Sequence, residues 1–98
     1  MEIKLKKEDK KLEIALEGRL DTNTSGDLES KIDELKGIEE LVLNFENLYY
    51  ISSAGLRVLL SMQKLMNKQG SMKILNAKDT VKDVFDVTGF SDILNIEE

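Results

Sequence analysis

The feature that most constrains the fold of this chain is the period of its hydrophobic pattern, which changes along the sequence. Apolar and polar residues alternate over 3–6 and again over 12–17. This two-residue period is typical of strands that bury one face. The short polar stretch 8–10 between them favours a turn, so the beginning of the chain is predicted to be an antiparallel hairpin.

A helical period replaces the alternation from Thr24 onward. Apolar residues now recur three or four positions apart, at Leu28, Ile32 and Leu35. Thr24 and Asp27 match a capping box, and Gly37 is a typical residue for the end of a helix. The pattern therefore predicts one helix over about 24–37.

The second half of the chain repeats the change from strand to helix twice. The continuous apolar run 41–43 is typical of a parallel strand that is covered on both faces. A helix is predicted over 53–69, then a strand over 71–75 and a third helix that ends at Gly89. The last apolar stretch, 93–96, is either an edge strand or a helical turn.

This order of elements predicts a single α/β domain over residues 1–98. Strands that alternate with helices imply right-handed crossovers. We therefore expect a mixed sheet of four to five strands, antiparallel in the first hairpin and parallel afterwards, with three to four helices packed against it. The chain has no proline and no low-complexity tract or repeat that would mark a boundary. Partner sites in such folds collect where strands end and helices begin.

The composition excludes several classes of function. The chain has no cysteine and no histidine, which excludes disulfides, thiolate nucleophiles, metal sites of these residues and a Ser–His pair. A serine hydrolase would need another base, and the Gly-x-Ser-x-Gly motif is absent. The net charge of −5 argues against nucleic acid as a partner. Neither a membrane span nor a signal peptide is evident, so we expect a cytoplasmic protein without a cofactor, whose partner is a protein.

Two serines stand before the helix that is predicted over 53–69. Either could serve as its cap, because a serine oxygen can accept a bond from a free backbone N–H. On a helical wheel, Ser53 shares a flank with Leu56, Leu60 and Arg57, outside the arc that we assign to the sheet, whereas Ser52 projects inward or caps. The two leucines then form a second apolar spot. It contacts either a neighbouring helix or a partner.

The segment LYYISSAGLRVLL, together with GRLDTNTSGDL and the strand LVLNF, resembles the STAS-domain anti-sigma factor antagonists of bacteria. The resemblance covers essentially all 98 residues. It implies a protein that, when unmodified, binds an anti-sigma factor with serine kinase activity and so frees the sigma factor. Phosphorylation at Ser53 would break this complex, and a PP2C-type phosphatase would restore it. The chain would be a substrate of enzymes and not an enzyme.

The resemblance and the wheel together give the expected docking surface around the phosphorylation site Ser53. Its predicted partner-binding residues are Asp21, Thr22, Asn23, Ser52, Gly55, Leu56, Arg57 and Leu60. The chain departs from the family where many members have Asp directly before the phosphorylated serine, because Ser52 stands there. Relatives without the switch serve as scaffolds or as accessory subunits of transport complexes, and this is the alternative function. We expect a monomer in the absence of the partner.

Overall fold

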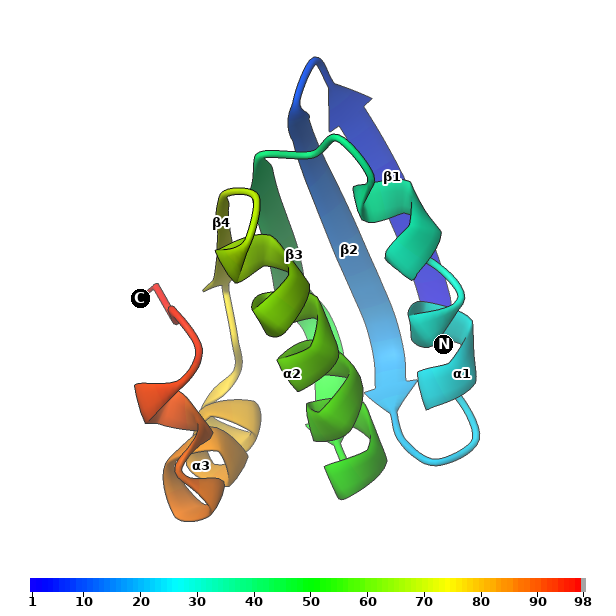
Figure 1. Ribbon diagram of the computed structural model, residues 1–98. Coiled ribbons are helices and arrows are strands. Elements are labelled where there is room, and N and C mark those ends of the chain that lie inside the picture. The colour runs from blue at the N-terminus through cyan, green and yellow to red at the C-terminus, as the bar shows by residue number, and fades with distance from the viewer. Residues whose placement is uncertain (98) are drawn as a thin grey trace.

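The strands form one mixed sheet whose spatial order follows the sequence (Figure 1). The computed structural model describes residues 1–97. Its strands are β1 (Glu2–Glu8), β2 (Lys11–Leu20), β3 (Glu40–Ile51) and β4 (Ser71–Leu75). β1 pairs with β2 antiparallel, and the pairs β2–β3 and β3–β4 are parallel. The predicted fold, an antiparallel hairpin followed by parallel strands, is confirmed.

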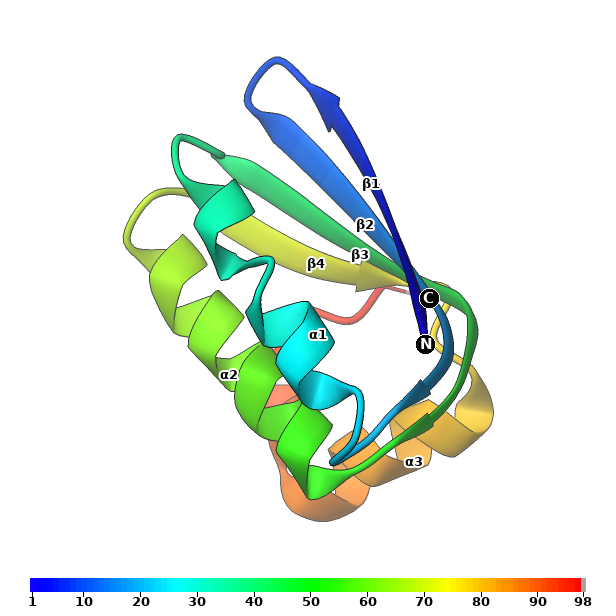
Figure 2. The same cartoon turned by 90° about the vertical axis from the view of Figure 1, so that its right-hand side faces the viewer.

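The helices lie on one face of this sheet and at one of its ends. They are α1 (Ser25–Glu29), the 3-10 helix η1 (Ile32–Leu35), α2 (Ser53–Asn67), α3 (Asp79–Thr88) and the 3-10 helix η2 (Phe90–Asp92). α1, η1 and α2 cover the same face, and α3 lies near the end where β3 leads into α2 (Figure 2). The buried residues form one core between the sheet and the helices.

The core depends on the registers of the first three strands. Ile14 pairs with Leu43, and both side chains are fully buried under the helices. Leu59, Met62 and Met66 of α2 are also fully buried, as the wheel predicted. Burial of side chains of this size contributes about 1.5 to 3 kcal/mol each before entropy is counted. The apolar stripe of α2 is therefore the main attachment of this helix to the sheet.

The prediction of one continuous helix over 24–37 is wrong, because the segment divides into α1 and η1. The Ser30 hydroxyl bonds the Asp27 carbonyl at 2.6 Å and so competes with the helical pattern where α1 ends. The predicted capping box is not formed either, because Thr24 makes no side-chain cap bond. Its hydroxyl donates to the Arg19 carbonyl at 2.7 Å instead.

β3 is longer than the predicted strand 41–43. Bulges interrupt the alternation of apolar and polar residues in β3, so the sequence pattern did not indicate its full length. Its register against β2 shifts twice, and each shift places an extra residue in β3. Its pairing with β4 ends at Asn44, so the remainder of β3 continues beside β2 alone. The stretch 93–96 divides between its two alternatives. The N–H groups of Ile93 and Leu94 bond the Phe90 carbonyl in a helical turn, and Ile96 then forms a parallel bridge with Ile74 at the edge of the sheet.

Gly55 allows the first turn of α2 to approach the end of β2. A Cβ atom at this position would lie 2.7 Å from Leu20 Cγ, and 3.0 Å from both Ile51 Cγ1 and the Leu20 carbonyl oxygen. These distances are shorter than van der Waals contact. The glycine therefore has a packing role inside this chain, and it is buried.

Replacing Gly55 with Ala should lower the free energy of unfolding by about 1 to 3 kcal/mol, because the methyl group overpacks the contact with Leu20. Gly26→Ala is the matched control, since nothing lies within 4 Å of its Cβ position. In the helix α1 this second change should be neutral or stabilising by up to about 1 kcal/mol. Urea unfolding measures both variants. Equal stabilities of Gly55→Ala and the unchanged protein would contradict the packing argument.

Candidate functional site

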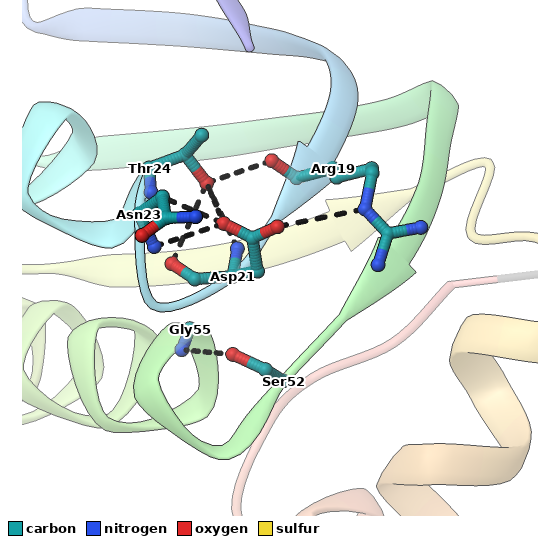
Figure 3. A network of polar contacts seen from close by, with 6 residues as sticks. All are labelled: Arg19, Asp21, Asn23, Thr24, Ser52 and Gly55. Atoms are coloured by element: carbon teal, nitrogen blue, oxygen red, sulfur yellow. Dashed lines mark hydrogen bonds and ion pairs between the residues drawn. The ribbon is translucent and has the colours of Figure 1, made fainter.

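The candidate site lies where β2 and β3 end and α2 begins. The Ser52 backbone N–H donates to the Leu20 carbonyl at 2.9 Å, which joins the ends of the two strands. The loop after β2, which carries Asp21, therefore lies beside the first turn of α2 (Figure 3). Of the predicted site residues, the structure brings the Asp21 loop and the two serines to one edge of the sheet, the usual place for ligand sites in such folds.

The Asp21 carboxylate is held in place by its own loop. Its Oδ1 accepts hydrogen bonds from the backbone N–H groups of Asn23 at 3.0 Å and Thr24 at 3.2 Å (Figure 3). Its Oδ2 lies 3.5 Å from Arg19 Nε. The Asp21 N–H in turn donates to the Thr24 hydroxyl at 2.8 Å. An aspartate that bonds the backbone two residues ahead forms a local turn, so the carboxylate position is set by the loop.

The charge of Asp21 follows from these bonds. Partial burial by itself raises the pKa of the Asp21 carboxyl. The hydrogen bonds from Asn23, Thr24 and Arg19 outweigh this effect, because they favour the charged form, and the pKa lies below its ordinary value. The side chain remains 24% exposed. A fixed negative charge therefore stands beside the N-terminus of α2 at neutral pH.

The two serines have different positions. Ser52 is the N-cap of α2, and its side-chain oxygen accepts from the Gly55 N–H at 3.5 Å. Ser53 is the first residue of the helix, and its side chain is exposed. Within residues 1–97 the Ser53 hydroxyl has no hydrogen-bond partner. Of the two serines, Ser53 thus has the hydroxyl that is both exposed and not engaged as a cap.

The placement of Leu56 outside the core is wrong. Its side chain is only 4% exposed and belongs to the core. A wheel includes only the helix and one sheet under it, whereas α2 contacts α1 as well as β3 and β4. Leu60 is half-buried and Arg57 is exposed. These two residues remain on the surface beside Ser53.

Two exposed tyrosines flank the site and were not among the predicted site residues. Tyr49 is 61% exposed and Tyr50 is 41% exposed. The Arg19 guanidinium lies 4.2 Å from the centre of the Tyr50 ring, and Lys78 Nζ lies 4.9 Å from that of Tyr49. The doubled tyrosine before the serines is the signal in the sequence that could have pointed to them. Side chains of a regular strand alternate between its two faces, so a regular strand would bury one of the two tyrosines.

Within residues 1–97, no group of three or more acidic, histidine or cysteine side chains is arranged to hold a metal ion. No helix in the same range is long and apolar enough to cross a membrane.

Known proteins share both the sequence pattern and the fold of this chain. The family model described as the STAS domain matches residues 2–98. The chain belongs to the STAS domain family. A relative from Staphylococcus aureus, named anti-sigma-B factor antagonist, is 29% identical over 94 residues, which cover 93% of this chain and 87% of that protein. The resemblance to anti-sigma factor antagonists that the sequence motifs indicated is therefore confirmed.

Solved structures share this STAS fold. The anti-sigma factor antagonist SpoIIAA in its unphosphorylated form superposes with a TM-score of 0.84 at 22% identity, covering 99% of this chain and 89% of that one. Phosphorylated SpoIIAA of Bacillus gives a TM-score of 0.75 at 22% identity, with coverage of 99% and 92%. A sulfate transporter family protein from Wolinella succinogenes gives 0.74 at 16% identity, with coverage of 85% and 70%. At these identities the structural matches establish the fold alone.

The lowered pKa of Asp21 leads to a prediction about pH. Asp21→Asn should lower the free energy of unfolding at neutral pH, and this deficit should shrink in acid. The folded-state pKa lies below the ordinary value of 3.8, so the carboxylate stabilises the fold above that value. Its contribution is lost as the pH falls through the lower folded-state pKa. Urea unfolding of both proteins at a series of pH values tests this, and a deficit that stays constant into acid would contradict it.

Proposed function

We propose that this protein is an anti-sigma factor antagonist that is released from its partner by phosphorylation of Ser53. The partner is an anti-sigma factor with serine kinase activity. The observation that carries the proposal is the exposed Ser53 hydroxyl at the start of α2, beside the fixed Asp21 carboxylate. Ser52 is a weaker candidate, because its side chain already serves as the helix cap.

The phosphate acts on the interface through its charge. A phosphoserine carries about −1.5 to −2 charges at neutral pH and must lose its water when it is enclosed by a partner. Asp21 directly follows Leu20, whose carbonyl bonds the Ser52 N–H, and the loop holds the Asp21 carboxylate in place at this same end of the strands. Like charges brought together at an interface cost several kcal/mol, and each ~1.4 kcal/mol lowers affinity tenfold. One phosphate can thus lower the affinity for the partner by about 100-fold, which releases it.

The free domain tolerates the same phosphate. At Ser53 it faces the N-terminus of α2, where negative charge is favoured by about 0.3 to 1 kcal/mol. Arg57 stands one turn further along the helix, at the spacing where side chains of opposite charge interact. The first turn of α2 contains no acidic residue. The modification therefore separates the complex while the domain stays folded.

The protein contributes a hydroxyl and a docking surface, and other proteins supply the chemistry. The chain contains no histidine that could act as a base beside Ser53. The kinase provides the base, the magnesium ion and ATP, and a PP2C-type phosphatase removes the phosphate. We place this cycle in the cytoplasm, with the free protein as a monomer. Asp21, Thr22, Asn23, Arg57 and Leu60 are the proposed partner-binding residues.

A scaffold without a phosphate switch is the second candidate. The STAS fold of a sulfate transporter family protein favours it, since this fold also occurs in transport proteins. The presence of Ser52 in place of the Asp that often precedes the phosphorylated serine also favours it. Incorporation of phosphate by an anti-sigma factor kinase distinguishes the two functions, because a constitutive scaffold takes up none.

The proposed function predicts that Ser53 takes the phosphate. Purified anti-sigma factors of the histidine-kinase-like ATPase fold from the same genome serve as the kinases, and mass spectrometry locates the phosphate. Ser53→Ala should abolish labelling and stay bound to the kinase. Ser53→Asp should fold normally and bind at least about tenfold more weakly, because it carries part of the charge of a phosphate. Ser52→Ala should lose about 0.5 to 2 kcal/mol of stability as a lost cap and still be labelled.

Two outcomes would overturn this prediction. Phosphate on Ser52 alone would refute the assignment of the site. Phosphorylated protein that binds the kinase as tightly as the unmodified protein would refute the switch.

The flank of α2 provides a prediction about docking. Leu60→Ala should weaken binding to the same kinase while lowering the free energy of unfolding by less than about 2 kcal/mol, because Leu60 is half-buried. Leu56→Ala is the comparison variant. It should lose about 2 to 5 kcal/mol of stability, because its side chain lies in the core. Calorimetric titration and urea unfolding measure the two effects, and a Leu60 variant that binds normally would remove this residue from the interface.

A further inference from the structure

A bulge in β3 turns two consecutive tyrosines toward solvent. Gly18 pairs with Leu48, but the next residue of β2, Arg19, pairs with Tyr50, so Tyr49 is the extra residue. Side chains of a regular strand alternate between its faces, and a bulge redirects them. Here both Tyr49 and Tyr50 are exposed, whereas Leu48 and Ile51 on either side are buried. The bulge therefore creates an aromatic surface immediately before the serines of the site.

Each exposed ring is covered by a cation from a neighbouring segment. Arg19 lies across the strand pair from Tyr50, with its guanidinium 4.2 Å from the ring centre. Lys78, the N-cap of α3, holds its Nζ 4.9 Å from the centre of the Tyr49 ring. A cation over an aromatic face is attracted by the ring, by about 0.5 to 1 kcal/mol at exposed sites. These contacts bring each ring and its cation together on the surface.

The two cations at this surface differ in how carboxylates compensate them. Lys78 forms no ion pair within residues 1–97. Arg19 is paired with the Asp21 carboxylate, whose Oδ2 lies 3.5 Å from its Nε. Lys78 is therefore the uncompensated cation beside the two rings, in a chain whose net charge is −5. A partner that places carboxylates at this surface would be attracted, whereas the acidic remainder of the protein would repel them.

We propose that Tyr49, Tyr50, Arg19 and Lys78, here called the tyrosine patch, dock an acidic segment of the anti-sigma factor. Tyrosine and arginine are the residue types that most often carry the binding energy of protein interfaces, because they combine a large apolar area with polar groups. The patch is continuous with the site, since Tyr50 stands only three residues before Ser53. The inference rests on the proposed function and adds to it that the part of the partner in contact with this patch is acidic.

The test measures binding of variants to the purified anti-sigma factor kinase by calorimetric titration. Tyr49→Ala and Tyr50→Ala should each weaken binding about tenfold or more, as expected of central interface residues. Tyr49→Phe is the matched control, and it should bind within about twofold, because it retains the ring and its contact with Lys78. Thermal unfolding verifies that each variant is folded. Tyr49 and its variants remain informative even if Tyr50→Ala is unstable, because the Tyr49 ring lies mostly in solvent.

Charge reversal tests the acidity of the partner. Lys78→Glu should weaken binding about tenfold, and the difference should diminish at high salt, where exposed charges are screened. Lys6→Glu changes the net charge equally at an exposed position on β1 and should leave binding within about twofold. If the unchanged protein binds no kinase, the proposed function fails and the patch fails with it. If it binds, and the tyrosine and Lys78 variants bind equally well, only the patch is refuted.

Discussion

The contact between the first turn of α2 and the end of β2 is the one on which the site depends. The Ser52 N–H bonds the Leu20 carbonyl, and Gly55 lets the helix approach the Leu20 side chain more closely than any residue with a Cβ could. The same contact belongs to the core and holds Ser53 beside the Asp21 loop. A change that loosens this packing would therefore alter stability and the proposed docking surface together.

The charges around Ser53 differ in how firmly they are held, and this determines what a phosphate would do. Asp21 is fixed by backbone donors, so its repulsion of a phosphate cannot be relieved by rotation of the side chain. Arg57 is an exposed side chain without an ion pair within residues 1–97, and it is free to turn toward the phosphate. Under the proposed function, the monomer would accommodate the charge, whereas an interface that covers Asp21 and Ser53 together would not.

Local hydrogen bonds and bulges explain why parts of the fold could not be predicted from the sequence. The Thr24 hydroxyl was predicted to cap a helix, but it bonds the Arg19 carbonyl, which the fold places within reach. Leu56 was placed outside the core by a wheel that includes only the helix itself, and its burial depends on what surrounds the first turn of α2. The bulge at Tyr49 of β3 likewise depends on how β3 pairs with β2, and the sequence of β3 alone does not contain this pairing. A periodic pattern contains no information about such neighbours.

The sequence by itself determined the α/β order of elements, the antiparallel first hairpin, the family and the segment that carries the two serines. These follow from hydrophobic periods and local motifs, which each segment contains on its own. The helical wheel already indicated that Ser53 faces outward, and the tertiary structure decided that Ser52 is the cap, because this role depends on where α2 begins. It also decided that Asp21 is a fixed carboxylate and that both Tyr49 and Tyr50 face solvent. The physical reason is that burial, hydrogen bonding and charge at this edge arise from strand ends that are distant in the chain and adjacent in the sheet.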